Sequence, residues 1–226
     1  MADWFLPLFP LKLVLFPHAE LALHIFEERY KQMIGECLEH GWEFGIVLAE
    51  EDSLNSTGCT ASILRVVKKY DDGRMDIIAR GQRRFEILHL DHAMPYLRCE
   101  AQLFDDEEAE PPSEDARRQA LELYNDLAKK LADENPDAAA QAPDAGDPQL
   151  SFAIAGRLPA ELAFRQSLLP LRSESERLRR VILHLQQLTL RLTVVAKARA
   201  RAGGNGRGRS LPTPPRRDPG GEPPLS

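Results

Sequence analysis

The stretch LPLFPLKLVLFPHAELALHIFEERY, from Leu6 to Tyr30, decides how the chain begins to fold. Its three prolines fix φ and each removes a backbone donor, so no helix can run through them. The apolar runs between the prolines are short, which favours strands or edge segments. After Ile25 the apolar residues recur at helical spacing as far as Leu38, and Gly41 stands where a helix would end. The stretch predicts a strand, a turn, a second strand and one amphipathic helix.

Short strand signals continue to about Asp105. The turn DDG at Asp71–Gly73 separates two β-rich runs and predicts a hairpin. Gly81 is expected at a bulge or tight turn that needs an unusual φ. This spacing favours a small barrel or folded sheet over a parallel α/β sheet. The predicted strand segments are FGIVLA (44–49), CTASILRVVKKY (59–70), RMDIIAR (74–80), RFEILHL (84–90) and YLRCEAQLF (96–104).

Beyond the strands the apolar period becomes helical. Ser113, Asp147 and Ser173 stand where helix N-caps are expected, and Ser173 with Glu176 forms a capping-box pattern. We therefore expect a β domain with one helix at 1–105, an acidic linker at 106–115, a helical bundle at 116–200 and a disordered, basic, Gly/Pro-rich tail at 201–226.

Charge and cysteine content narrow the class of protein. From Lys197 onward the chain holds seven basic and two acidic residues, whereas the preceding part holds 22 basic and 33 acidic ones. A body this acidic is a poor binder of nucleic acid. Three widely spaced cysteines argue against a disulfide framework and favour reduced thiols. No secretory or membrane-spanning pattern is evident, so a cytoplasmic location is expected.

Motifs for catalysis are not found in the sequence. There is no Gly-Lys pair for a Walker A phosphate loop, no G-x-S-x-G elbow and no H-E-x-x-H or C-x-x-C metal motif. We therefore expect no enzyme activity, and no catalytic, cofactor-binding or metal-binding residues.

Four segments in order resemble the N-terminal domain family of Lon protease: LPLFPLKLVLFPHAELALHIFEERYKQMI, FGIVLAE, GCTASILRVVKKYDDGRMDIIARGQRRFEIL and LSFAIAGRLPAELAFRQSLLPLRSESERLRRVILHL. The resemblance covers Trp4 to Leu188 and depends on the ordered set. It implies an α+β fold, with a β-rich, PUA-like pseudo-barrel followed by a helical bundle. In Lon this region recruits and holds protein substrates, while downstream modules hydrolyse ATP and cut peptides. No such modules are recognisable here, so a stand-alone, non-catalytic substrate-binding domain is expected.

The resemblance implies polypeptide clients, unfolded ones included, or a partner protease or chaperone. We expect Leu21 and Leu23, in a loop HAELALH, to contact the polypeptide, with Phe26 and Tyr30 supporting them from the core. In the alternative for this stretch the prolines mark strand ends and the apolar side chains form the barrel core, namely Leu8, Leu13, Leu15, Phe16, Ile25 and Phe26. The alternative function is an RNA-associated PUA-like protein that uses its basic tail, because GNGRGR resembles RGG-type segments.

Two roles are also open for Arg83 and Arg84. These side chains either have a structural role or bind an acidic partner.

Overall fold

The computed structural model describes residues 5–51, 53–107, 111–134 and 142–204. The chain divides into two units, Met1–Gln187 and Leu188–Ser226, and the first of them holds all the strands. The elements of the described residues are β1 (Leu6–Leu11), β2 (Glu20–Ile25), α1 (Glu28–His40), β3 (Phe44–Ala49), β4 (Leu54–Lys69), β5 (Met75–Asp91), β6 (Arg98–Phe104), α2 (Glu114–Glu134), α3 (Leu150–Ala155), α4 (Leu162–Leu168) and α5 (Glu174–Gly204).

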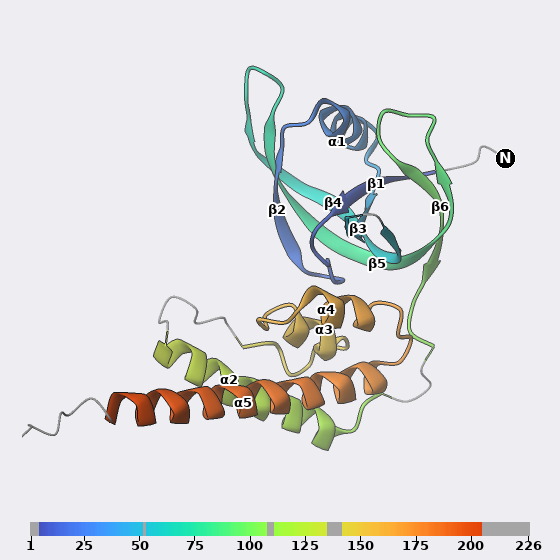
Figure 1. Cartoon of the computed structure of the whole chain (residues 1–226). Coiled ribbons are helices and arrows are strands. Elements are labelled where there is room, and N and C mark those ends of the chain that lie inside the picture. The colour runs from blue at the N-terminus through green and yellow to red at the C-terminus, as the bar shows by residue number, and fades with distance from the viewer. Residues whose placement is uncertain (1–4, 52, 108–110, 135–141, 205–226) are drawn as a thin grey trace, which may run out of the picture. The chain divides into compact units, whose positions relative to one another are not determined.

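The strands form a closed barrel with one strand added outside it. The order β2-β5-β4-β3-β1-β6 closes because β6 also pairs with β5 (Figure 1). The long strand β5 pairs with β2 through Met75–Arg80 and with β6 through Arg84–Asp91. Among the strands that the structure describes, β1 and β3 run parallel and the other pairs are antiparallel. A barrel removes most sheet edges, and β2 is left with one edge open.

Strand β1 tolerates two prolines because each of its sides is paired over part of its length. It pairs with β3 from Leu8 to Leu11, and with β6 only at Leu6 and Pro7. The missing donors of Pro7 and Pro10 therefore cost few ladder bonds. These prolines lie inside the strand, whereas the sequence pattern placed them at strand ends.

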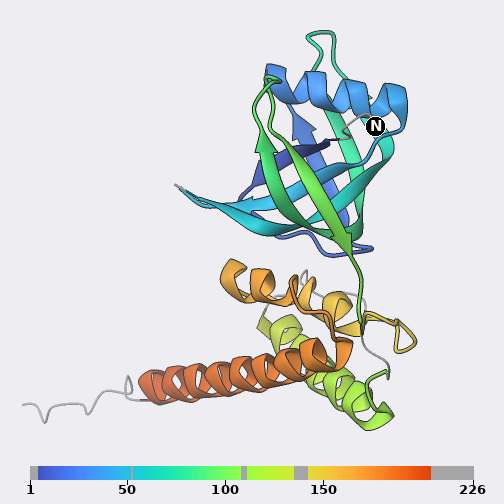
Figure 2. The same ribbon diagram turned by 90° about the vertical axis from the view of Figure 1, so that its right-hand side faces the viewer.

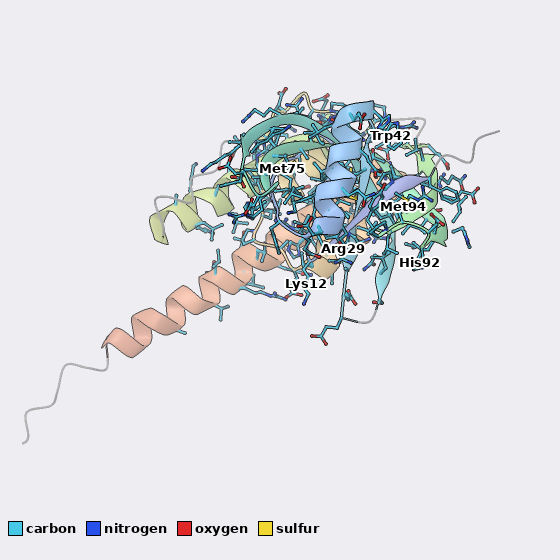
Figure 3. All side chains as sticks on the ribbon, turned by 90° about the horizontal axis from the view of Figure 1, so that it is seen from above. Lys12, Arg29, Trp42, Met75, His92 and Met94 are labelled. Atoms are coloured by element: carbon cyan, nitrogen blue, oxygen red, sulfur yellow. The ribbon has the colours of Figure 1, made fainter. Side chains whose placement is uncertain are left out.

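Helix α1 lies across one end of the barrel (Figure 2). Its buried face, Tyr30, Met33, Ile34 and Cys37, packs into the main core beside Met75. Seen from above, Arg29 and Trp42 mark opposite ends of the helix, and Met75 lies beside it (Figure 3). Gly41 ends α1 in the left-handed conformation, at φ 68°.

Most predicted elements are present, with several differences. The two segments predicted on either side of Gly81 form one continuous strand, β5. The loop predicted around HAELALH is strand β2. Ser113 and Ser173 accept hydrogen bonds from the backbone N–H groups of Ala116 and Glu176, as caps do. Helix α5 continues to Gly204, beyond the predicted end at 200, and the rest of the predicted tail, 205–226, lies outside the described residues.

Candidate polypeptide-binding site

Strand β2 offers an unpaired backbone edge. Among the described residues it pairs only with β5. The N–H of Gly81 donates to the carbonyl of Ala19 at 2.9 Å. This bond shows which residues of β2 direct their backbone groups toward β5. Bonded and non-bonded positions alternate in antiparallel pairs, so the backbone groups of Glu20, Ala22 and His24 face away from β5. An extended polypeptide can pair with such an edge by strand addition.

The four residues predicted to bind polypeptide occupy different environments. Leu21 and Leu23 are partly buried and pack against the main core from β2, so they are less available than a loop would make them. Tyr30 is buried in that core, as predicted. Phe26 was expected in the core but is 60% exposed, just beyond the end of β2. The apolar side chain presented at this edge is therefore that of Phe26.

A small polar cluster of His24, Tyr70 and Asp76 fixes the end of β2 next to Phe26. The His24 ring lies 5.9 Å from the Phe26 ring, and its Nδ1 lies 2.6 Å from a carboxylate oxygen of Asp76. The Tyr70 hydroxyl donates to the other oxygen of Asp76 at 2.9 Å. These hydrogen bonds from His24 and Tyr70 hold the pKa of Asp76 below its ordinary value. The cluster ties β2 to β5 and to Tyr70, the residue after β4, while leaving Phe26 exposed.

A hollow of about 380 Å³ opens at the start of β2. One wall is the connection Pro17–Glu20, and the other is formed by residues of and beside α3, Phe152 and Arg157 among them. Gly81 holds this connection in place, because its carbonyl accepts a hydrogen bond from the N–H of His18 at 2.8 Å. Gly81 lies beside a register shift between β4 and β5, as expected of a bulge, but its φ is not positive. Gly81 is needed for space, since a Cβ there would lie 2.2 Å from the Phe16 carbonyl oxygen.

Arg84 joins the barrel to the helical region, and its role was left open by the sequence. Its side chain is buried, and Nη2 donates to a carboxylate oxygen of Asp106 at 2.6 Å. Nη1 donates to the carbonyl of Leu169 at 3.0 Å and also to that of Leu171. The acidic partner of Arg84 therefore lies within this chain.

Arg177 completes a buried ion network around Asp106. Its guanidinium donates to both oxygens of Asp106 at 2.6 Å and to Glu174 at 2.7 Å. Ser151 also donates to Glu174, at 2.6 Å from its hydroxyl. Burial alone would raise the pKa of Asp106, but the hydrogen bonds from Arg177 and the nearby positive charges outweigh it and lower that pKa. Apart from Arg84, the residues of this network were not singled out from the sequence, because Asp106, Ser151 and Arg177 lie far apart in it.

The three cysteines are structural thiols. Cys37, Cys59 and Cys99 are buried and free, and burial raises the pKa of each to about 12. Because the thiolate is the reactive form, we expect negligible labelling of the native protein by iodoacetamide at pH 8 and labelling of all three thiols in urea. Mass spectrometry of both samples checks this, and rapid labelling of any one in the native protein would contradict it.

The matched segment of the chain covers both the barrel and the helical region. Residues 5–187 match the family model of the ATP-dependent protease La (LON) substrate-binding domain. The chain belongs to this family. Lon protease 2 of Herpetosiphon aurantiacus is 30% identical over 195 residues, which are 80% of this chain and 24% of that protein. Lon protease of Escherichia coli K12 is 27% identical over 192 residues, 76% of this chain and 23% of that protein. The chain thus spans about a quarter of the length of these curated relatives.

Solved structures of Lon N-terminal domains have a similar fold. The Lon N-terminal domain protein from Xanthomonas campestris has a TM-score of 0.59 at 23% identity, with 80% of this chain and 98% of that chain covered. The N-terminal domain of the Mycobacterium avium complex Lon protease has a TM-score of 0.59 at 18% identity, with 81% and 98% covered. The family resemblance and the α+β fold predicted from the sequence are confirmed.

The matched region of Lon is its non-catalytic, substrate-binding domain. Within the described ranges, no group of three His, Cys, Asp or Glu side chains is placed to hold a metal ion. Over the same residues, no helix has the length and hydropathy needed to cross a membrane.

Proposed function

We propose that this chain binds extended, unfolded polypeptide segments without catalysis, as a client-holding protein that acts with a protease or chaperone. The observation that carries the proposal is the open edge of β2, which ends at the exposed Phe26 in a domain of the Lon substrate-binding family. Main-chain pairing supplies affinity for many sequences, and an apolar side chain beside the edge favours unfolded over folded clients.

The hollow at the start of β2 extends the proposed site. A segment paired with Glu20 continues past Ala19 toward the hollow, because Glu20 and Ala19 line it. Ordering a flexible client costs free energy, so we expect affinity in the micromolar range, about −8 kcal/mol or weaker.

Phe26→Ser is the test of this proposal. Phe26 is largely exposed, so its loss removes binding surface and leaves the fold intact. We expect binding of a reduced, carboxymethylated model protein to weaken about tenfold, the effect of losing part of one aromatic contact. Fluorescence anisotropy with the labelled client measures it. The Leu21 and Leu23 side chains are poorer test sites, because changing them also disturbs the core.

Leu88→Ser is the matched control, since Leu88 is 56% exposed on β5 and lies away from β2. We expect client affinity within about twofold of the parent. Equal binding by the Phe26→Ser variant and the parent would remove Phe26 from the site. A parent protein with no preference for unfolded over folded client would refute the client-holding function.

A further inference from the structure

The second half of β4 presents another unpaired edge. Strand β3 pairs with β4 only from Leu54 to Ala61, so Ser62–Lys69 pairs only with β5 among the described residues. In Figure 1 the β4–β5 hairpin projects past the end of β2. The backbone N–H of Tyr70 donates to the carbonyl of Arg74 at 2.9 Å. By alternation along the ladder, the backbone groups of Lys69 face away from β5.

Two apolar side chains stand exposed along this edge. Leu64 is 38% exposed and Val67 is 60% exposed. Neither has a paired position on β5, because the register shifts between Ile63 and Arg65 and again between Val66 and Lys68. Bulges protect an edge against indiscriminate pairing. Exposed Leu and Val side chains do the opposite, since they add apolar surface that a specific partner strand can cover.

The edge is also basic, and Asp76, which lies opposite Lys68 on β5, is already hydrogen-bonded to His24 and Tyr70. Arg65, Lys68 and Lys69 are all exposed. Within the described residues the side chains of Arg65 and Lys69 have no hydrogen bond or ion pair, and the Lys68 ammonium rests 4.3 Å above the Tyr70 ring. The nearby acid Asp72 already pairs with Arg74 at 2.7 Å.

The basic side chains of the β4 edge determine which kind of strand can pair with it. Pairing of two β4 edges from two copies of the chain would bring basic side chains together, and like charges opposite each other destabilise a strand pair. Arg65 and Lys68 lie on one face of the sheet, because their partners Ile78 and Asp76 are two residues apart on β5, and Lys69 lies on the other face. A strand that alternates acidic and β-branched residues instead places its carboxylates on the face of Arg65 and Lys68 and its apolar side chains on the other face. We propose that the β4 edge, Ser62–Lys69, docks an extended acidic segment of a partner protein by strand addition. The proposal concerns a different edge from β2 and does not depend on client binding there.

A pair of capped synthetic peptides tests the charge preference. One alternates glutamate and valine, and the other alternates lysine and valine at the same length. We expect the glutamate peptide to bind the full chain about tenfold more tightly at low salt, because two opposite-charge cross-strand pairs form with it and two like-charge pairs form with the lysine peptide. The difference should shrink as salt rises. Equal affinity for the two peptides, or no measurable binding of the glutamate peptide, overturns the proposal.

Reversing the charge of two β4 side chains tests whether the preference for the glutamate peptide arises at this edge. The double variant Arg65→Glu, Lys68→Glu changes both cations on one face of the sheet and should lose about tenfold in affinity for the glutamate peptide and gain affinity for the lysine peptide. The control Lys129→Glu, Lys130→Glu makes the same change of net charge on exposed positions of α2. Its affinities should match those of the parent. Equal losses in the two double variants would indicate a nonspecific charge effect and refute a β4 site.

Amide hydrogen exchange reports the strand pairing directly. With the glutamate peptide bound, the outward N–H of Lys69 should be protected, whereas the N–H groups of Ala22 and His24 on β2 should exchange as in the free protein. Alternate N-methylation of the peptide backbone should abolish both binding and protection, since it removes the ladder donors. Protection confined to β2, or binding that survives N-methylation, would contradict strand addition at β4.

Discussion

Replacing Arg177 by Met is expected to lower the free energy of unfolding by about 3–5 kcal/mol, the cost of breaking a buried ion pair from one side. The Arg177 side chain is 0% exposed and donates to Asp106 and Glu174, so both carboxylates lose their main cation. Methionine can fill part of the vacated volume, but it supplies no donor for those oxygens. Urea unfolding followed by circular dichroism measures the change.

Arg180→Met is the control, because Arg180 lies on the same helix and pairs with Glu176 at 2.6 Å on the surface. Exposed pairs contribute about 0–1 kcal/mol, so this variant should resemble the parent. Adding Glu174→Gln to Arg177→Met should cost less than the two single changes combined, since it removes one uncompensated charge. An Arg177→Met variant within about 1 kcal/mol of Arg180→Met would show that the network contributes little.

The fold was predictable where local signals agreed with it. Proline spacing, the DDG turn and Gly41 each act over a few residues, and they located β1, the β4–β5 hairpin and the end of α1. Strand β5 was predicted as two segments because Gly81 weakens a strand locally. In the folded chain the Phe16 carbonyl occupies the space beside Gly81, which is a tertiary reason that no local pattern reveals.

The candidate site was less predictable than the fold. Whether Phe26 or Leu23 is exposed depends on which face of β2 meets the core, and a shift of one residue exchanges the faces. The buried network depends on Arg84, Asp106 and Arg177 meeting across three segments. Charged residues are mostly exposed, so no local pattern marked the two arginines as buried. The burial of both arginines follows from geometry that only the structure supplies.

Gly81→Ala is expected to be the other severe substitution, with a loss of about 3 kcal/mol or more, the upper end of the cost of overpacking. The new Cβ would lie 2.2 Å from the Phe16 carbonyl oxygen, an atom of the backbone that cannot rotate away. The connection Phe16–Ala19 must shift, which strains its hydrogen bonds with Gly81. Thermal and urea unfolding measure the loss.

Gly35→Ala makes the same chemical change with the opposite expected sign. Gly35 lies inside α1, and a Cβ at this position would meet no atom within 4 Å, so alanine should stabilise the helix by about 0.5–1 kcal/mol. The comparison separates steric conflict from any general effect of removing a glycine.

Gly81 also holds in place the connection that leads into β2. The Gly81→Ala protein that remains folded should therefore bind unfolded client more weakly than the Gly35→Ala protein. Unchanged stability and client binding in Gly81→Ala would mean that the connection moves freely, and a fixed β2 edge could not then be the basis of binding.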